Sequence, residues 1–401
     1  MRPAANMAMP LDRAGEQPVR LEPVPASDAL RTLVHDREDG IPGALAQDWI
    51  ALADEASEPN SFAEHWFVAA SLATLASGRE LRLIEVRRGG QLTGIMPVAI
   101  EQFYGRTTVR FVQNWCHHQS FLGTPLVRAG EEAEFWSAVL DTLDASDWAP
   151  NFLHLRGMVE DGPVLRGLAE AAAERGRGSP TVHREARALL VGGLDSRTYF
   201  ERTVRPKKRK EIRRLLSRLT ERGPVQARRL EPGDELQDWC DAFLALEKAG
   251  WKGRVGTALA CAAETEAFFR ATVSGAFAAG KLDFLRLDLE GRPVAMLVNF
   301  IAAPGAFSFK TCFDEQFARF SPGVLIQLEN LKILDRGDIA WVDSCAVPDH
   351  PMIDSFWSGR RDIIRVTVRL KGIRRSLVFA VCRALEVGIG TLRRLSAREN
   401  P

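Results

Sequence analysis

Residues 281–300, KLDFLRLDLEGRPVAMLVNF, decide the fold that we expect for this chain. Two runs rich in apolar residues flank Glu290 and Gly291, and two such runs around a glycine turn predict a β-hairpin. Residues 264–279, directly before the hairpin, carry apolar side chains at helical spacing and predict a helix. The chain is therefore expected to run helix, strand, turn, strand in this region.

The same order of elements occurs in the first half of the chain. Residues 62–76 have apolar side chains at helical spacing, and they precede residues 81–100, LRLIEVRRGGQLTGIMPVAI. Gly89 and Gly90 mark the turn of this other predicted hairpin. Two copies of one order of elements indicate a duplicated α/β unit.

A further strand, helix and strand follow the second hairpin. The predicted elements are a strand at 307–312, a loop at 313–320, a helix at 324–334 and a strand at 339–343. Ser321 and Pro322 fit the N-cap and the first position of the helix. Because backbone N–H groups at a helix start bind phosphates and oxyanions, we expect the chemistry of the protein near this start.

Composition excludes several classes of protein. The chain has 401 residues, 46% hydrophobic and 26% charged, which suits two globular domains and excludes a disordered scaffold, a fibrous repeat or a disulfide-framed secreted module. Lys plus Arg number 53 against 52 Asp plus Glu, and aromatic residues do not alternate with the basic clusters, so no nucleic-acid partner is expected. The six cysteines form no CxxC pair, which predicts isolated buried thiols in a reducing compartment.

The distribution of apolar and basic residues bears on location. The first 25 residues lack the apolar core of a signal peptide, and no stretch is apolar enough to span a membrane. Residues 202–218 and 360–398 are rich in Lys and Arg and also carry spaced apolar residues. Such basic amphipathic helices bind membrane surfaces or acidic partners, or else pack on their own lobe. We expect a cytoplasmic protein that docks peripherally on the inner face of the cytoplasmic membrane if the first of these applies.

Four stretches taken together resemble the GNAT superfamily of acyltransferases. They are KEIRRLLSRL at 210–219, LEKAGWKGRVG at 246–256, LDLEGRPVA at 287–295 and CFDEQFARFSPGVL at 312–325. In order and spacing they are most similar to the two-lobed CelD/BcsL (BioF-like) acetyltransferase branch, which is distantly related to the FemAB peptidyltransferases. The resemblance extends from about Leu45 to Arg361.

The resemblance implies an α/β fold of tandem GNAT-like (acyl-CoA N-acyltransferase) lobes in a FemAB-like arrangement. The implied divisions are a loosely ordered lead-in at 1–44, a first lobe at 45–195, a second lobe with the acyl-donor site at 196–358 and a basic amphipathic segment at 359–401. It also implies an acyl-thioester co-substrate, with no permanently bound cofactor and no metal. The usual pyrophosphate loop has two small residues, whereas Arg319–Val324 has one glycine, and Pro322 removes a backbone donor. An acyl carrier protein (ACP) therefore competes with acyl-CoA as the donor.

Five residues are candidates for proton transfer, because an attacking amine must lose a proton and a departing thiolate must gain one. His117 and His118 follow a predicted strand, where loop histidines can act as bases, although a surface pair is the competing interpretation. Glu247 lies in a family-like stretch and is a candidate to accept the proton of the acceptor; an ordinary glutamate on a helix surface is the competing interpretation. Asp343, at a strand end, and His350, in the loop that follows, are candidates for an acid–base pair; a turn or cap role for Asp343 is the alternative.

Two further groups of residues are candidates for ligand contacts. The donor-contact set consists of Lys310, Ser321, Gly323 and Val324, and the substrate-contact set consists of Trp251, Lys252 and Asp314. Lys310 is expected to meet a donor phosphate, with an ordinary exposed lysine as the alternative. Trp251 is expected to wall the substrate groove.

We expect N-acyl transfer from acyl-CoA or acyl-ACP to an amine. The more specific hypothesis is a long-chain lipid amine such as a sphingoid base, as in the bacterial ceramide synthases that resemble this GNAT class. It rests on the basic amphipathic ends of the chain and on the phenylalanine-rich second lobe, since a long acyl chain needs an apolar channel. The phenylalanines proposed to line a channel for the acyl chain are Phe300, Phe307, Phe309, Phe313, Phe317 and Phe320. The alternatives are an acetyltransferase of cell-envelope polysaccharide precursors, a non-catalytic membrane-associated GNAT-fold scaffold, and a FemAB-like aminoacyl transferase.

Overall fold

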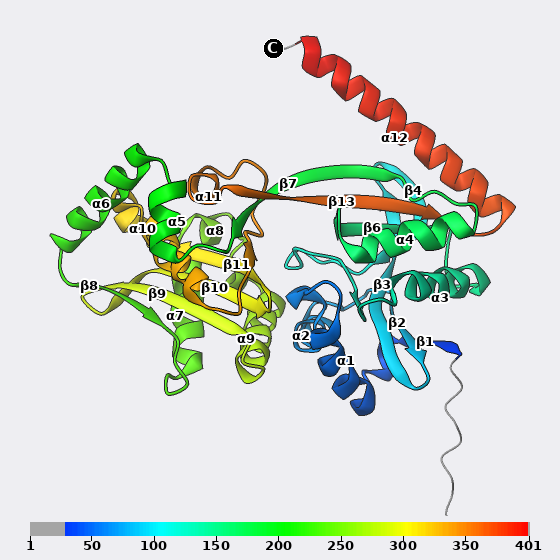
Figure 1. Ribbon diagram of the computed structural model, residues 1–401, viewed down its shortest axis with the longest axis horizontal. Helices are drawn as coiled ribbons and strands as arrows, with labels where there is room; N and C mark the ends of the chain where they lie inside the picture. Colours follow the sequence, from blue (N-terminus) through cyan, green and yellow to red (C-terminus); the bar gives the residue numbers. More distant parts are fainter. Residues whose placement is uncertain (1–28, 400–401) are drawn as a thin grey trace, which may run out of the picture.

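A single mixed sheet runs through both lobes of the molecule. The computed structural model describes the backbone of residues 29–399 and the side chains of residues 29–386. The strand order is β1-β2-β3-β4-β6-β13-β7-β12-β11-β10-β9-β8, and β5 pairs with β3. Figure 1 shows β7 and β13 as long strands that pass from one lobe to the other. The two lobes are therefore joined by hydrogen-bonded strands as well as by the chain itself.

The first lobe contains six strands and four α-helices within the described residues. Its strands are β1 (Leu30–Asp36), β2 (Leu81–Arg88), β3 (Gln91–Tyr104), β4 (Thr107–Asn114), β5 (Leu126–Val127) and β6 (Phe152–Val159). Its helices are α1 (Gly43–Glu55), α2 (His65–Thr74), α3 (Glu132–Ala145) and α4 (Pro163–Glu174). Apolar faces of α3 and α4 pack on the sheet and bury Phe135, Trp136 and Leu168 in one core.

The second lobe repeats this plan. Its strands are β8 (Val225–Arg229), β9 (Leu282–Leu289), β10 (Arg292–Ala302), β11 (Gly305–Phe313) and β12 (Trp341–Asp343). Its α-helices are α5 (Ser196–Thr203), α6 (Pro206–Thr220), α7 (Leu236–Ala249), α8 (Trp251–Arg254), α9 (Ala263–Ala278), α10 (Pro322–Asn330) and α11 (Pro351–Asp354). The predicted loop at 313–320 contains the 3-10 helix η4 (Glu315–Phe320), and the predicted helix at 324–334 is α10 followed by the 3-10 helix η5 (Leu331–Asp335).

The duplicated unit predicted from the sequence is present. In each lobe an antiparallel three-stranded meander leads through a helix to a parallel strand, as β2-β3-β4-α3-β6 and as β9-β10-β11-α10-β12. The parallel contact is short in both, covering Val112 and Gln113 of β4 and residues 305–307 of β11. Beyond these residues the Gly123 loop and the Asn114 side chain bond to the backbone of β6 in the first lobe. In the second lobe the pairing of β11 with β12 ends at Phe307, which leaves an edge of β11 where an extended ligand can bind.

Two segments differ from the expected divisions of the chain. Residues 30–36, expected in a loose lead-in, form β1 and pair with β2 along seven residues. Residues 359–369, expected in a basic tail, form β13 (Gly359–Arg369), which pairs with both β6 and β7 (Thr181–Val191). The strand is buried because Val366 and Val368 belong to the core of the first lobe. Residues 1–28 and 400–401 of the expected segments lie outside the described residues.

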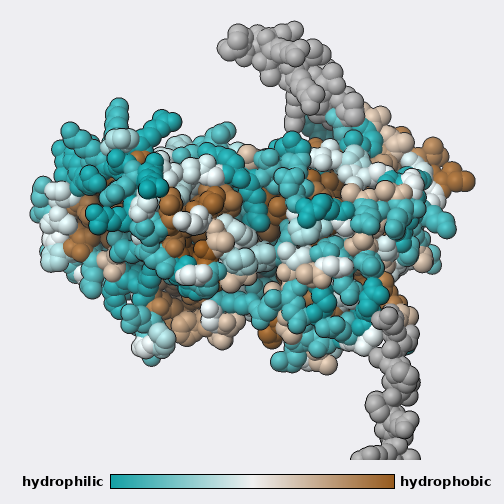
Figure 2. Space-filling model, viewed as in Figure 1, coloured by the Kyte–Doolittle hydropathy of each residue, from teal (hydrophilic) through white to brown (hydrophobic). Residues whose placement is uncertain are grey.

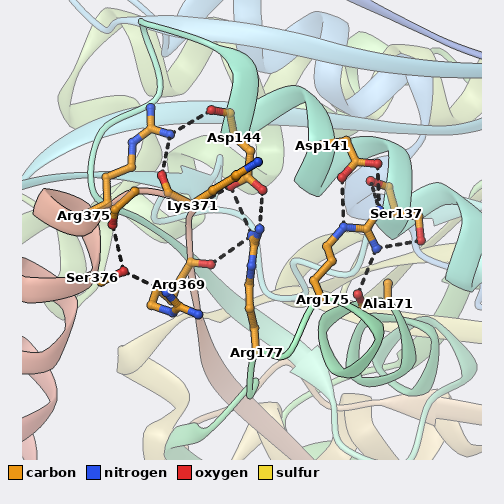
Figure 3. A network of polar contacts seen from close by, with 11 residues as sticks. Ser137, Asp141, Asp144, Ala171, Arg175, Arg177, Arg369, Lys371, Arg375 and Ser376 are labelled. Carbon is orange, nitrogen blue, oxygen red and sulfur yellow. Dashed lines mark hydrogen bonds and ion pairs between the residues drawn. The ribbon is translucent and has the colours of Figure 1, made fainter.

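The tail proper is α12 (Ile373–Glu399), which leaves the body of the molecule at an angle (Figure 1). Its base is anchored by the Arg375 guanidinium, which donates to the backbone carbonyls of four residues: Asp144 at 3.0 Å, Lys371, Ser146 and Ala149. Figure 3 shows Arg375 beside Asp144 and Lys371. The Asp144 carboxylate accepts in turn from the backbone N–H of Lys371 and from Arg177. The base of α12 is thus fixed to the first lobe. None of the described helices combines the length and apolar character that crossing a bilayer requires.

An aromatic core joins the two lobes. Phe62 and Phe67 of the first lobe contact Phe307 and Phe300 of the second, at ring-centre distances of 5.2 and 6.3 Å. The phenylalanines proposed as an acyl channel therefore divide between two packed cores: Phe300, Phe307 and Phe309 lie in this one, and Phe313, Phe317 and Phe320 lie in or against the core of the second lobe. Their rings fill space that a channel would need.

Candidate active site

Lys310 lies where the two lobes meet. Its ammonium is 5.4 Å from the ring centre of Phe121, in the loop after β4, and 5.4 Å from that of Phe309. Among the described residues, no hydrogen bond or ion pair reaches this ammonium. Burial, assisted by the positive charge of Lys252, lowers the pKa of Lys310 to about 8. An amine with this pKa gains and loses a proton near neutral pH, which makes Lys310 the best-placed group for proton transfer.

A β-bulge directs Lys310 toward this position. Val298 of β10 pairs with Lys310 and Asn299 pairs with Ser308, so Phe309 has no partner across the ladder. The extra residue interrupts the alternation of β11, and it brings Lys310 over the ring of Phe309, its own neighbour in the strand. A regular strand would direct these two side chains to opposite faces of the sheet.

Glu247 and Lys252 lie beside Lys310 but are paired with each other. The buried Glu247 accepts from Lys252 Nζ with Oε1 at 2.8 Å and from the backbone N–H of Leu259 with Oε2 at 2.8 Å. Both carboxylate oxygens are therefore engaged. The structure gives Glu247 an electrostatic role next to Lys310 and does not support its expected role as the base.

Asp343 ends β12 as expected, but its partners differ from the expected one. Its fully buried carboxylate accepts from the backbone N–H of Cys345 at 2.9 Å and faces Arg361 Nη1 at 3.4 Å. His350 caps α11 by accepting the N–H of Ile353 with Nδ1 at 3.4 Å. The expected acid–base pair of Asp343 and His350 is not formed. Asp343 instead contacts Cys345 and Arg361, and His350 caps α11.

Cys345 completes the surroundings of Lys310, and no motif in the sequence singles it out. Its backbone has a φ of 52°, uncommon for a residue with a side chain. Burial and the nearby Asp343 raise the pKa of its thiol well above the ordinary value. A thiol that stays protonated is a weak nucleophile, so this site favours direct attack by an acceptor over an acyl-cysteine.

The expectation of buried thiols fails at Cys261, which is exposed.

The two histidines of the first lobe have separate environments. Burial and the neighbouring charges of His118, Arg79 and Lys310 lower the pKa of His117 to about 3. Its Nδ1 accepts from the N–H of Gln119 at 3.2 Å, so Nε2 carries the proton and donates to Ser71 at 3.0 Å. With both nitrogens engaged, His117 is a packing residue rather than the expected base.

His118, by contrast, is exposed, and the structure leaves its expected role as a prediction.

The start of α10 offers few donors for a phosphate. Ser321 has a left-handed backbone with φ 50°, and its side chain makes no capping hydrogen bond. The N–H of Val324 donates to the Ser321 carbonyl at 2.9 Å, and Pro322 has no N–H. Gly323 is buried, and a Cβ there would lie 3.3 Å from the Phe313 ring. The expected donor contacts of Ser321, Gly323 and Val324 therefore fit poorly, and no polar contact joins them to Lys310 in the described part of the chain.

Residues of the substrate-contact set border a separate hollow. A cavity of about 690 Å³ lies between the end of α7, η4 and the edge of β10, and it is lined by Gly250, Arg254 and Asp314 among others. Asp314 caps η4 by accepting the N–H of Gln316 at 2.9 Å. Trp251 is 54% exposed beside this hollow, so its indole is free to contact a ligand.

The structure thus brings Glu247, Lys252 and Lys310 together and links them through Cys345 to Asp343. It separates them from the start of α10 and from His350. Phe121, beside Lys310, and Arg361, beside Asp343, come from segments far away in sequence. Only the aromatic and basic character of these residues is visible in the sequence, and it does not distinguish them from many others.

Comparison with known proteins bears on the fold and on the class of the second lobe. Residues 206–348, from α6 to just beyond β12, match a family model described as an acetyltransferase (GNAT) domain. No curated protein sequence matches the chain. A solved structure titled FemX has 10% sequence identity and a TM-score of 0.58, covering 84% of this chain and 98% of its own.

Two further solved structures are similar. A conserved protein of unknown function from Bacteroides thetaiotaomicron has 12% identity and a TM-score of 0.51, covering 82% of this chain and 98% of its own. A tandem GNAT protein from the clavulanic acid biosynthesis pathway has 15% identity and a TM-score of 0.44, covering 86% of this chain and 99% of its own.

Fold and domain match together define the class: tandem GNAT-like lobes in a FemAB-like arrangement, with a GNAT acetyltransferase domain in the second lobe. The chain is an acyltransferase of the GNAT type, and its co-substrate is an acyl thioester.

Proposed function

We propose that this protein is an N-acyltransferase whose acceptor amine is deprotonated at Lys310. The observation that carries the proposal is the desolvated, unpaired ammonium of Lys310 at the contact between the lobes, beside the ring of Phe121. The acceptor nitrogen attacks the thioester carbonyl, a C–N bond forms and the C–S bond breaks. Neutral Lys310 takes the proton released by the nitrogen and passes it to the departing thiolate, so that amide and thiol are the products and Lys310 is neutral again.

The open edge between β11 and β12 is the proposed groove for the donor. β12 pairs with β11 only over residues 305–307, so the side of β11 that faces β12 is unpaired from Ser308 onward. A pantetheine arm carries amide groups, which can hydrogen-bond to such an edge as an added strand does. This groove leads to Lys310, which lies three residues beyond the last paired residue, Phe307.

We assign the donor's anionic part to α6, because the start of α10 is short of donors. A cavity of about 570 Å³ at the start of α6 is lined by Arg205, Lys207, Lys208 and Arg360, among others. The apolar face of α6, with Ile212, is buried in the lobe, and its basic face is outside. This surface suits the phosphates of CoA and equally an acidic carrier protein.

A lipid acceptor remains the more specific hypothesis, and α12 supports it. Ile373, Leu377, Val381 and Leu385, spaced by four residues, are 85%, 64%, 61% and 45% exposed. Figure 2 shows hydrophobic surface at the base of this helix. An apolar stripe flanked by Arg and Lys suits the surface of an anionic membrane. The remaining apolar residues expected on this face, among them Ile389, lie beyond the described side chains.

The test is release of free thiol by the purified protein from acetyl- to palmitoyl-CoA, with and without a long-chain amino alcohol. Release that needs both a long acyl chain and the amino alcohol supports lipid N-acyl transfer. Release from acetyl-CoA without the lipid amine favours the polysaccharide-precursor alternative. If neither CoA nor ACP thioesters release thiol, the proposal of catalysis at Lys310 fails and the scaffold alternative gains. Lys310→Met should abolish release, whereas exposed Lys248→Met should leave it unchanged.

A further inference from the structure

A small polar pocket lies between the first lobe and the two connecting strands. Its volume is about 100 Å³. The loop after β4 and the strands β6, β7 and β13 supply its walls, and its charged residues are Arg156, Arg187, Arg365 and Glu185. Three guanidinium groups therefore face one carboxylate. A pocket of this size and charge holds a small oxyanion rather than a whole substrate.

Two of these arginines face each other without a carboxylate between them. Ile364 pairs with Met158 and Val366 with Leu155, so Arg365 lies opposite Arg156 at an irregularity of the ladder. Burial and the neighbouring Arg156 lower the pKa of Arg365. Like charges at opposed positions of neighbouring strands destabilise a sheet unless something neutralises them.

Within the described residues nothing neutralises them. The side chains of Arg156 and Arg365 have no hydrogen bond or ion pair there. Glu185 is taken by Arg187, whose Nη2 donates to it at 2.9 Å. Burial raises the pKa of the Cys116 thiol to about 11, so this wall residue stays neutral. The half-buried Arg156 and Arg365 are thus left without a paired carboxylate, although the charge of Glu185 acts on Arg365 from a distance.

The pocket is also rigidly built. Asn114, 2% exposed, accepts the N–H of Arg156 at 2.8 Å and donates to the carbonyls of Gly123 and Arg156, each at 2.8 Å. A Cβ on Gly123 would lie 2.0 Å from the Arg156 carbonyl, so only glycine allows this approach of loop and strand. A second ladder irregularity, between β13 and β7, also falls at Arg365. Bulges on both sides of one residue re-aim its side chain, here into the pocket.

We infer that this arginine pocket binds an anionic group of the acceptor, a phosphate or a carboxylate. Phe121 connects the pocket to the reaction centre: its carbonyl accepts from Arg187, and its ring lies 5.4 Å from Lys310 Nζ. An acceptor held by its anionic group at Arg156 and Arg365 can present an amine to Lys310 across one phenyl ring. That the bound anion belongs to the acceptor rests on the proposed function. The existence of the anion site does not.

Anion binding can be measured without turnover. The melting temperature of the full chain is followed in inorganic phosphate, acetate and chloride at equal ionic strength. Wild-type protein should gain about 2 °C for each tenfold rise of phosphate or acetate above its Kd, and nothing from chloride. Arg365→Gln and Arg156→Gln should lose this gain. Arg184→Gln should retain the gain, because it removes an exposed arginine of β7 that pairs with Glu160 outside the pocket.

The same variants separate a binding role from a structural one. Without anion, Arg365→Gln should melt at or above the wild-type temperature, because it removes an unpaired charge that faces Arg156. A lower melting temperature without anion, with the phosphate gain retained, would overturn the inference. So would the absence of any gain in wild-type protein. Neither result depends on catalysis, so failure of the proposed function stays distinguishable.

Three probes distinguish the source of the anion. Glycerol 3-phosphate represents a soluble phosphate ester, β-alanine a soluble carboxylate, and vesicles containing phosphatidic acid a lipid headgroup. The probe whose effect is lost in Arg365→Gln and kept in Arg184→Gln identifies the class. If all three act equally on wild-type protein and on Arg365→Gln, the pocket is not the binding site.

Discussion

Lys310 shows how one misaligned residue in a strand can create a reactive group. The bulge at Phe309 brings its ammonium among aromatic rings, and the loss of water there makes the charged form costly. The ion pair of Glu247 and Lys252 stands nearby but takes no hydrogen bond from it. The lysine consequently titrates in the range where an acceptor amine must lose its proton.

The rate of acyl transfer should depend on pH through Lys310. Because its pKa is about 8, the neutral form grows about tenfold per pH unit below 8 and then levels off. kcat/KM should follow the same curve, and Lys310→Met should lower it by about 10²- to 10⁴-fold. A pH–rate profile in saturating acyl thioester measures this.

Stability gives an independent check on the same residue. The pKa of Lys310 is about 8 in the fold and 10.5 ordinarily, so the unfolded chain binds more protons between these values. The resulting penalty is fully present below pH 8 and is relieved as pH rises to 10.5. Lys310→Met should melt higher than wild type at pH 7 and converge with it near pH 10. A rate that stays flat between pH 6 and 9 would exclude Lys310 as the base.

Asp343 should stabilise the folded protein. Its carboxylate is fully buried, and it faces Arg361 at 3.4 Å while Arg187 lies nearby. Asp343→Ala leaves these guanidinium groups without their anion, which should lower the free energy of unfolding by about 3–5 kcal/mol. Chemical denaturation measures the loss. Asp338→Ala, which breaks an exposed pair with Arg336, serves as the control and should change stability by less than about 1 kcal/mol.

The sequence predicts the helices and the hairpins of this fold well, but it predicts the conformation at helix starts and the positions of β-bulges poorly. Hairpins at 81–100 and 281–300 follow from glycine turns between apolar runs. Ser321 and Pro322 were expected to start a phosphate-binding helix, and a helix does begin there. However, Ser321 has a left-handed backbone and makes no side-chain cap, and its carbonyl accepts the N–H of Val324, so this helix start is short of free donors. The bulge that orients Lys310 is not visible in the sequence.

If α6 binds the phosphates of the donor, reversing the charge of its basic residues should weaken the binding of acetyl-CoA but not that of acetyl-pantetheine. Arg205→Glu combined with Lys207→Glu should raise KM for acetyl-CoA about tenfold or more and leave KM for acetyl-pantetheine unchanged, since pantetheine lacks the phosphates. Steady-state kinetics with both thioesters measure the difference. Arg213→Glu combined with Arg214→Glu, on the exposed side of α6 away from the cavity, is the matched control. Equal effects on both donors would move the phosphates elsewhere.

The strand β13 joins the sheets of the two lobes into one. The strand returns from the second lobe and fills the sheet between β6 and β7, with Val366 and Val368 in the core of the first lobe. Composition predicts two domains, and two lobes are present. Their connection through residues 359–369 could not be predicted, because nothing local in this segment distinguishes a central strand from a basic tail. The helix α12 begins only after this strand has closed the sheet (Figure 1).

Two truncations should therefore behave in opposite ways. A chain ending at residue 358 lacks β13, leaves β6 and β7 without their shared partner, and should fail to fold. A chain ending at residue 371 keeps β13 and loses α12, so it should keep its sheet and its thiol release, while it loses binding to anionic vesicles because the stripe from Ile373 to Leu385 is gone. Circular dichroism, thiol release and vesicle sedimentation measure the three properties. Full vesicle binding by the longer truncation would assign membrane docking to a surface other than α12, and a folded shorter truncation would show that the lobes are independent.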